Sequence, residues 1–135
     1  MSSDGSVEIR VIFGDTDQMG VVYHSNYLRW FEASRGGFLR ARGRSYAELE
    51  ALGWGLPVVE AHVVYRRPAR YDDLVKITPR LEWVRPASFR FAYQAQRGEE
   101  LLAEGWTVHA CIDREGRPRR LPDEVRTVLL AQTGL

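Results

Sequence analysis

The 135-residue chain has little of several features that would place it in a specialised class of protein. It contains one cysteine, Cys111, so no disulfide can form within the chain. No apolar run approaches the roughly 18 residues that a membrane-spanning helix needs. The first ten residues also lack the charged and apolar regions of an export signal. These absences exclude a disulfide scaffold and predict a cytoplasmic protein without an integral membrane segment.

The chain also lacks an excess of charge of either sign. Nineteen basic residues stand against 18 acidic ones, and the pI is about 7.9. Such a balance gives no overall cationic field for nucleic acid or for an anionic membrane surface, so we expect no nucleic-acid partner. Lys76 is the only lysine, and arginine therefore supplies almost all of the positive charge. Because arginine binds phosphate in a bidentate manner, a local site for a phosphorylated ligand remains open.

The spacing of apolar residues predicts a strand, a long helix and then a run of strands. Residues 7–13 alternate between apolar and polar side chains, as in a half-buried strand. From about His24 to Arg42 the apolar residues recur at helical spacing. Four later stretches have the composition and alternation of strands, namely residues 56–67, 74–83, 88–96 and 101–113. Short connections that contain glycine, at 97–99 and 114–116, favour antiparallel pairing.

Local signals refine this pattern. A capping box from Ser45 to Glu48 predicts a short helix, and residues 122–131 predict another. Pro79 within a predicted strand indicates a sheet edge or a bulge. Two adjacent glycines at 36–37 should each weaken the long helix by about 1 kcal/mol relative to alanine. We therefore expect another backbone to approach the helix closely at that point.

These elements predict an α+β protein in which one long central helix lies on one face of a curved antiparallel sheet. The length suits a single domain over residues 1–135. Such a sheet leaves its second face and its edges uncovered. Because pairing of two subunits would bury them, we expect a homodimer and, by further association, a homotetramer.

The segment from Phe13 to Trp30, FGDTDQMGVVYHSNYLRW, joins the first predicted strand to the long helix and concentrates the reactive groups. A carboxylate at a helix N-terminus lies beside unpaired backbone N–H groups. The segment can therefore offer a base or nucleophile together with an electrophilic cradle. Most of the functional reasoning depends on this combination.

A metal site and a reactive thiol are the alternatives. Residues 15–20 begin like a calcium loop, but Met19 and Asn26 stand where a ligand and a bidentate glutamate are required. The three histidines have no zinc spacing with Cys111 or with each other, so we predict no metal. Cys111 and His109 would share one face of a strand, but this proximity alone does not activate a thiol. A carboxylate, Asp15 or Asp17, remains as the reactive group.

The stretch FGDTDQMGVVYHSNYLRWFEASR resembles the signature of the 4-hydroxybenzoyl-CoA thioesterase family, and especially its YbgC-like acyl-CoA thioesterase branch, which has the hot-dog fold. The family pattern Asp-x-Asp-x-x-Gly-x-Val-x-x-x-x-Tyr is matched without gaps by Asp15, Asp17, Gly20, Val22 and Tyr27. A second stretch, PARYDDLVKI, resembles the turn and third strand of the family. The resemblance covers nearly the whole chain.

The resemblance implies hydrolysis of an acyl-CoA thioester without a cofactor. The family's catalytic aspartate falls on Asp17, and its carbonyl-polarising backbone amide falls on His24. The side chain of His24 either assists the reaction or is a hydrogen-bonded neighbour of the site. Whether Asp17 attacks the carbonyl or activates water stays open at this point. Asp15 is expected to stabilise the turn through its backbone contacts.

The resemblance and the apolar pattern together suggest residues that bind the substrate. Those expected around the acyl group are Gly20, Tyr27, Phe31, Leu56 and Pro57, and those expected near the nucleotide or pantetheine arm are Arg85 and Ser88. The acyl group is undetermined, and its carrier is either coenzyme A or acyl carrier protein. Two other functions remain open, a hot-dog dehydratase or hydratase and a noncatalytic acyl-binding protein.

Overall fold

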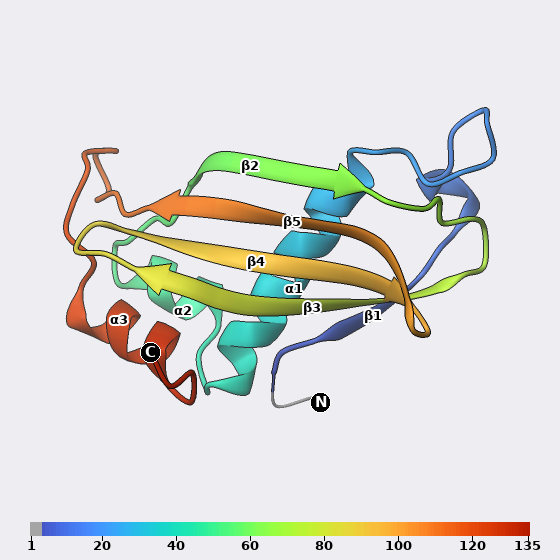
Figure 1. Cartoon of the computed structure of the whole chain (residues 1–135). Coiled ribbons are helices and arrows are strands. Elements are labelled where there is room, and N and C mark those ends of the chain that lie inside the picture. Colours follow the sequence, from blue (N-terminus) through green and yellow to red (C-terminus); the bar gives the residue numbers. More distant parts are fainter. Residues whose placement is uncertain (1–3) are drawn as a thin grey trace.

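Five strands form one antiparallel sheet that curves around a long helix in the computed structural model, which describes residues 4–135 (Figure 1). The strands are ordered β1-β3-β4-β5-β2 across the sheet. In chain order the elements are β1 (Val7–Arg10), a 3-10 turn η1 (Phe13–Asp15), α1 (Asn26–Ala41), α2 (Tyr46–Ala51), β2 (Val58–Tyr65), β3 (Leu74–Val84), β4 (Ser88–Arg97), β5 (Glu100–Ala110) and α3 (Asp123–Leu130). The structure confirms the predicted α+β class.

The core lies between α1 and the concave face of the sheet. Alternate residues of β3 and β4 point to the same face, and their apolar side chains are buried there. The ring of Phe31 on α1 stacks on that of Tyr93 on β4 at a centroid distance of 4.3 Å. About two helical turns further on, Phe38 meets Phe91 edge to face at a centroid distance of 4.8 Å. These aromatic pairs fix α1 across the middle of the sheet.

One of the two helix glycines explains how closely the backbone packs. A Cβ atom on Gly37 would lie 2.4 Å from the carbonyl oxygen of Gly5, which belongs to the segment that leads into β1. This confirms the expected close approach of another backbone. A Cβ on Gly36 would instead meet only the flexible end of the Arg40 side chain, at 3.0 Å. The two adjacent glycines therefore differ in what they contribute to the fold.

Two other local predictions are confirmed. Pro79 lies on β3 beyond Ile77, where the ladder with β1 stops, so this part of β3 forms a sheet edge. The capping box at the start of α2 is complete: the Glu48 N–H donates to the Ser45 hydroxyl, and the Glu48 carboxylate accepts from the Ser45 N–H. In residues 4–135, no helix has the length and apolar character needed to cross a membrane.

The predicted first strand is too long. The Asp15 carboxylate accepts the backbone N–H of Ile12 at 3.0 Å, and the chain turns there into η1 instead of continuing as a strand. Phe13, which the alternation grouped with the buried face, is 72 % exposed and stacks on Tyr71 at 3.9 Å. The turn therefore rotates Phe13 away from the core.

The glycine pair gives a test of the helix packing. Gly37→Ala should destabilise the protein by about 2 kcal/mol, because the added methyl group overlaps a backbone oxygen that cannot move without displacing β1. Gly36→Ala should be neutral or stabilising by up to about 1 kcal/mol, because alanine favours a helix and only a flexible side chain lies nearby. Urea unfolding of both variants measures the difference. Equal stabilities would contradict the close approach at Gly37.

Candidate active site

Asp17 lies on a tight turn of the loop that precedes α1. The Asp17 N–H donates to the carbonyl of Val21 at 2.9 Å, and the Gly20 N–H donates to the carbonyl of Asp17 at 3.0 Å. Gly20 has φ +79°, in the left-handed region that favours glycine. One carboxylate oxygen of Asp17 accepts the Met19 N–H at 2.8 Å, and the other has no hydrogen-bond partner in residues 4–135. The turn thus presents a half-buried carboxylate with a free oxygen.

Asp15 ties this loop to the helix. Its side chain is buried and is held by Ile12, while its carbonyl oxygen accepts the N–H of Tyr23 and the side-chain amide of Asn26, both at 2.8 Å. Asn26 is the first residue of α1. The backbone of Asp15 therefore fixes the loop against the start of the helix, in agreement with the structural role expected for this residue.

The start of α1 leaves a backbone donor free. The helix begins at Asn26, two positions after the predicted start, so His24 lies just outside it. Among the described residues, none accepts a hydrogen bond from the His24 N–H, and the Ser25 side chain does not cap the helix. The His24 carbonyl accepts the hydroxyl of Tyr65 at 2.9 Å, and burial raises the pKa of that phenol, which keeps it a donor. The free N–H lies at the positive end of the helix dipole.

Within one chain the predicted site residues fall into groups at opposite ends of the sheet (Figure 1). The ends of β2 mark the separation, because Tyr65 binds His24 whereas Val58 pairs with His109. A strand of eight residues spans about 23 Å. The Tyr65 end holds Asp17, Gly20 and His24, and the Val58 end holds Leu56, Pro57, Arg85 and Ser88.

Two further residues predicted to bind the substrate lie in the core. Tyr27 is buried and packs edge to face against Tyr65, with ring centroids 5.4 Å apart. Phe31 is fully buried against the sheet. Neither side chain lines the cavity described next, so their observed contacts are those of core residues that hold α1 in place.

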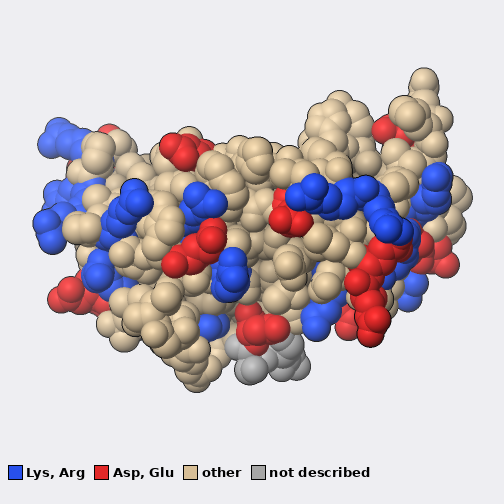
Figure 2. Space-filling model, viewed as in Figure 1, with Lys and Arg blue, Asp and Glu red and all other residues tan. Residues whose placement is uncertain are grey.

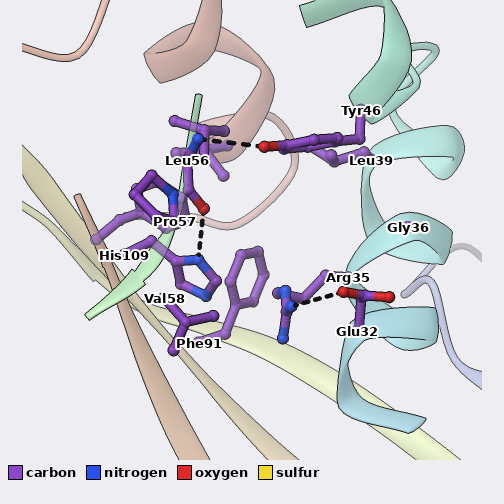
Figure 3. A pocket seen from close by; sticks show the side chains of 12 residues that line it. Glu32, Arg35, Gly36, Leu39, Tyr46, Leu56, Pro57, Val58, Phe91 and His109 are labelled. Atoms are coloured by element: carbon purple, nitrogen blue, oxygen red, sulfur yellow. Dashed lines mark hydrogen bonds and ion pairs between the residues drawn. The ribbon is translucent and has the colours of Figure 1, made fainter. Parts of the chain in front are cut away.

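A cavity of about 440 Å³ lies between α1, α2 and the sheet at the Val58 end (Figure 3). Its mouth is marked by the exposed side chains of Glu32, Tyr46 and Val58. Leu56 and Pro57, both predicted to contact the acyl group, line it. The other lining residues are mostly apolar and include Leu39, Phe89, Phe91 and Leu129. Its volume and lining are those of a pocket for a small, largely apolar ligand.

Two polar residues in the cavity wall, Arg35 and His109, were not predicted as site residues. Burial, and secondarily the Arg35 cation, lower the pKa of His109 from 6.5 to about 4. His109 is therefore neutral at physiological pH. Its Nδ1 lies 3.1 Å from the Leu56 carbonyl, which can only accept, so Nδ1 carries the proton and Nε2 is an acceptor.

A directed chain of hydrogen bonds joins these two residues behind the cavity wall. The Thr107 hydroxyl lies 2.8 Å from His109 Nε2 and donates to it. Tyr93 in turn donates its hydroxyl proton to Thr107 at 2.6 Å and accepts from the Arg35 guanidinium at 3.2 Å. Because arginine can only donate and a carbonyl can only accept, the two ends of the chain fix its direction. Each inner member uses both a donor and an acceptor.

The remaining candidate groups show little sign of reactivity. Cys111 is buried, and burial raises the pKa of its thiol, which therefore stays protonated. Both ring nitrogens of the neighbouring His109 are already hydrogen bonded, so it cannot act as a base toward the thiol. In the part of the chain that the structure describes, no three histidine, cysteine, aspartate or glutamate side chains are grouped as metal ligands.

Comparison with known proteins agrees with this architecture. Residues 11–129 match the family model described as "Thioesterase-like superfamily". The chain belongs to this family. It is 34 % identical over 119 residues to the acyl-CoA thioester hydrolase YbgC of Escherichia coli O157:H7, covering 87 % of this chain and 89 % of the relative.

Solved structures extend the likeness to the fold. A hypothetical protein from Thermus thermophilus superposes with a TM-score of 0.89 at 38 % identity, over 93 % of this chain and 96 % of the other. A second hypothetical protein, from Aquifex aeolicus, superposes with a TM-score of 0.88 at 34 % identity, over 92 % of this chain and 98 % of the other. These matches confirm the predicted hot-dog fold and the predicted thioesterase family with its YbgC-like relatives.

Protonation of His109 should link stability to pH. Its pKa is about 4 in the folded protein and 6.5 when unperturbed, so between these values the unfolded chain binds more protons than the folded chain. The free energy of unfolding should therefore fall as the pH is lowered from 6.5 to 4, by at most roughly 3 kcal/mol from this residue. Unfolding of the wild type and His109→Gln across this range measures the contribution.

The matched control is His24→Gln, which removes an exposed histidine outside β2. It should keep the pH dependence of the wild type, whereas His109→Gln should show a shallower decline. An identical decline in His109→Gln and the wild type would contradict the buried, neutral state of His109.

Proposed function

We propose that this chain is an acyl-CoA thioesterase that hydrolyses a small acyl or aroyl thioester, with Asp17 as nucleophile or general base. The main support is one geometric observation. Asp17 lies inside the small hairpin that is closed by the Thr16 to Val22 bridge, and His24 follows this bridge by two residues, so a carboxylate with a free oxygen and an unpaired N–H share one short segment. A thioester needs both groups for hydrolysis.

The proposed reaction proceeds at the thioester carbon. Either Asp17 attacks it and forms an acyl-enzyme anhydride that water then cleaves, or Asp17 removes a proton from water, which attacks directly. In both cases the His24 N–H, aided by the dipole of α1, stabilises the oxyanion. The C–S bond breaks, and the products are a carboxylic acid and a thiol. The exposed His24 ring, which contacts the Tyr23 ring at a tilt of 45° and a centroid distance of 4.3 Å, would protonate the leaving thiolate.

A homodimer would bring the two separated groups of site residues together. β2 is an edge strand, and none of its residues is buried. An edge strand with exposed side chains such as Val59, 56 % exposed, offers unpaired backbone groups to another strand. If β2 pairs antiparallel with its copy, the Val58 end of one subunit lies beside the Tyr65 end of the other. Each cavity would then open beside the Asp17 of the partner subunit.

Basic residues could then contact the phosphates of coenzyme A or acyl carrier protein. Figure 2 shows Lys and Arg side chains gathered at the left end of the molecule, where Figure 1 shows the β3–β4 turn and the loop after β5. Exposed arginines of these segments are Arg85, Arg114, Arg117, Arg119 and Arg120. Arg85 lies over the ring of Trp83 at 3.9 Å, so its guanidinium is held in place but keeps donors for a phosphate.

The alternative hot-dog activity, dehydration or hydration of an acyl thioester, has less support. That chemistry requires a histidine that moves a proton at the acyl chain. The histidine of the cavity, His109, is neutral, and both of its nitrogens are already bonded to protein groups. A noncatalytic acyl-binding protein would not require a carboxylate with a free oxygen, which Asp17 has.

Asp17→Asn should lower kcat for acyl-CoA hydrolysis by about 100-fold or more, because an amide is neither a nucleophile nor a base. The amide oxygen can still accept the Met19 N–H, so the turn should be preserved. Thiol release over a panel of acyl-CoA substrates measures the effect. Asp72→Asn, which changes an exposed aspartate in another turn, is the control and should retain activity. Full activity of Asp17→Asn, or water release without a free thiol, would contradict the proposal.

The dimer has its own test. Ala61 is exposed near the middle of β2, so Ala61→Lys should place two cations close together across a paired β2 edge and separate the subunits. We expect light scattering to give the mass of a monomer for this variant. We also expect its thioesterase activity to fall. Ala47→Lys, on the exposed face of α2, should change neither. A monomeric variant with full activity would refute the shared site.

A further inference from the structure

Arg35 has more hydrogen-bond donors than partners. It points from α1 into the cavity toward the sheet (Figure 3), and its side chain is only 17 % exposed. A guanidinium has five N–H donors, but the only hydrogen bond it donates within residues 4–135 goes to the Tyr93 hydroxyl. Its ion pair with Glu32 is loose, at 3.9 Å, and the Glu32 side chain is 81 % exposed. Most of its donors are therefore available to a ligand.

Apart from the loose ion pair with Glu32 at the mouth, the polar groups of the cavity wall do not balance the charge of Arg35. Tyr93, Thr107 and His109 have committed their acceptors to the hydrogen-bond chain that begins at Arg35. His109 is neutral, so it supplies no balancing charge. The Tyr46 hydroxyl at the mouth accepts the Leu56 N–H at 3.3 Å, and its own proton is free to donate. The polar part of the cavity therefore favours a ligand that carries acceptors and a negative charge.

The remainder of the wall favours hydrocarbon. Apart from these polar groups the lining consists mainly of leucine, phenylalanine, valine and proline side chains, which suit a chain of methylene groups or a ring. Inside such a wall an ion pair is screened less than in water, and a guanidinium can bind a carboxylate with two parallel hydrogen bonds. Glu32 opposes an anion only weakly, because it lies on the solvent side of Arg35.

We propose that the cavity receives an acyl group that ends in a second carboxylate, and that Arg35 binds this carboxylate. The substrates would be thioesters of dicarboxylic acids with about five to eight carbons, which suit a cavity of this size. The proposal rests on the thioesterase function proposed above and adds its substrate class. Arg35 is the specificity residue, and it is held toward the sheet by Tyr93.

The test compares paired substrates in the wild type and in Arg35→Met. Glutaryl-, adipyl- and suberyl-CoA are each compared with the monocarboxylic acyl-CoA of the same chain length, and kcat and KM are obtained from thiol release. In the wild type at least one dicarboxylic substrate should be preferred over its partner. In Arg35→Met the ratio of the two kcat/KM values should fall about tenfold or more, mainly through KM. Arg35→Lys should keep part of the preference, because the charge remains without the fork.

Arg40→Met removes the same charge from an exposed position of the same helix and should leave the ratio unchanged. An unchanged ratio in Arg35→Met, or a wild type that prefers the monocarboxylic partner at every length, would overturn the proposal. If the wild type hydrolyses no acyl-CoA, the proposed thioesterase function is refuted. Calorimetry of Asp17→Asn with suberyl- and octanoyl-CoA then still tests the proposed ligand class. Tighter binding of suberyl-CoA that depends on Arg35 supports it, and equal binding refutes it.

Discussion

The ring of Phe31 lies parallel to that of Tyr93 at 4.3 Å, and the position of α1 on the sheet depends on this contact. Both side chains are almost completely buried, so the helix cannot rotate or slide without opening the core. Two consequences follow along the helix. Its N-terminus is fixed beside the Asp17 turn, where the Asp15 backbone holds Asn26. Its middle is fixed over the cavity, where Arg35 reaches Tyr93 itself. The same aromatic residue therefore carries both the apolar contact and the first link of the polar chain.

That polar chain makes the cavity different from an ordinary gap in a core. A buried hydroxyl or imidazole is costly unless its hydrogen bonds are satisfied, and no buried side-chain polar atom among residues 4–135 lacks a partner. Thr107 and His109 meet this requirement in sequence: the Thr107 hydroxyl donates to His109, and His109 donates to the Leu56 carbonyl. The cost of burying Tyr93, Thr107 and His109 is thus offset with only one hydrogen bond donated by Arg35. A cation at the wall of an apolar cavity is the result.

Much of the fold could be predicted from the sequence, because the relevant signals are local. The Ser45 capping box, the edge position of Pro79 and the helical spacing of α1 each depend on residues close in the chain, and each was predicted correctly. The first strand was predicted too long because a side chain, Asp15, captures the Ile12 N–H and turns the chain, which no alternation pattern reveals. The polar chain was missed for a related reason. Except for Thr107 and His109, its members lie far apart in the sequence, and only the β4–β5 register brings Tyr93 near Thr107.

The separation of the site residues has a physical cause that also explains the exposed edge. A helix that crosses the concave face of a sheet has its N-terminus at one end and its later turns toward the other, so one subunit cannot offer the dipole at His24 and the cavity at Leu56 to one small ligand. In the homodimer proposed above, a twofold axis across the β2 edge would reverse the direction of the second sheet and remove this distance. β2 has an unpaired backbone edge, and the site residues are divided between its two ends. An isologous interface would pair that edge and join the two groups of site residues at once.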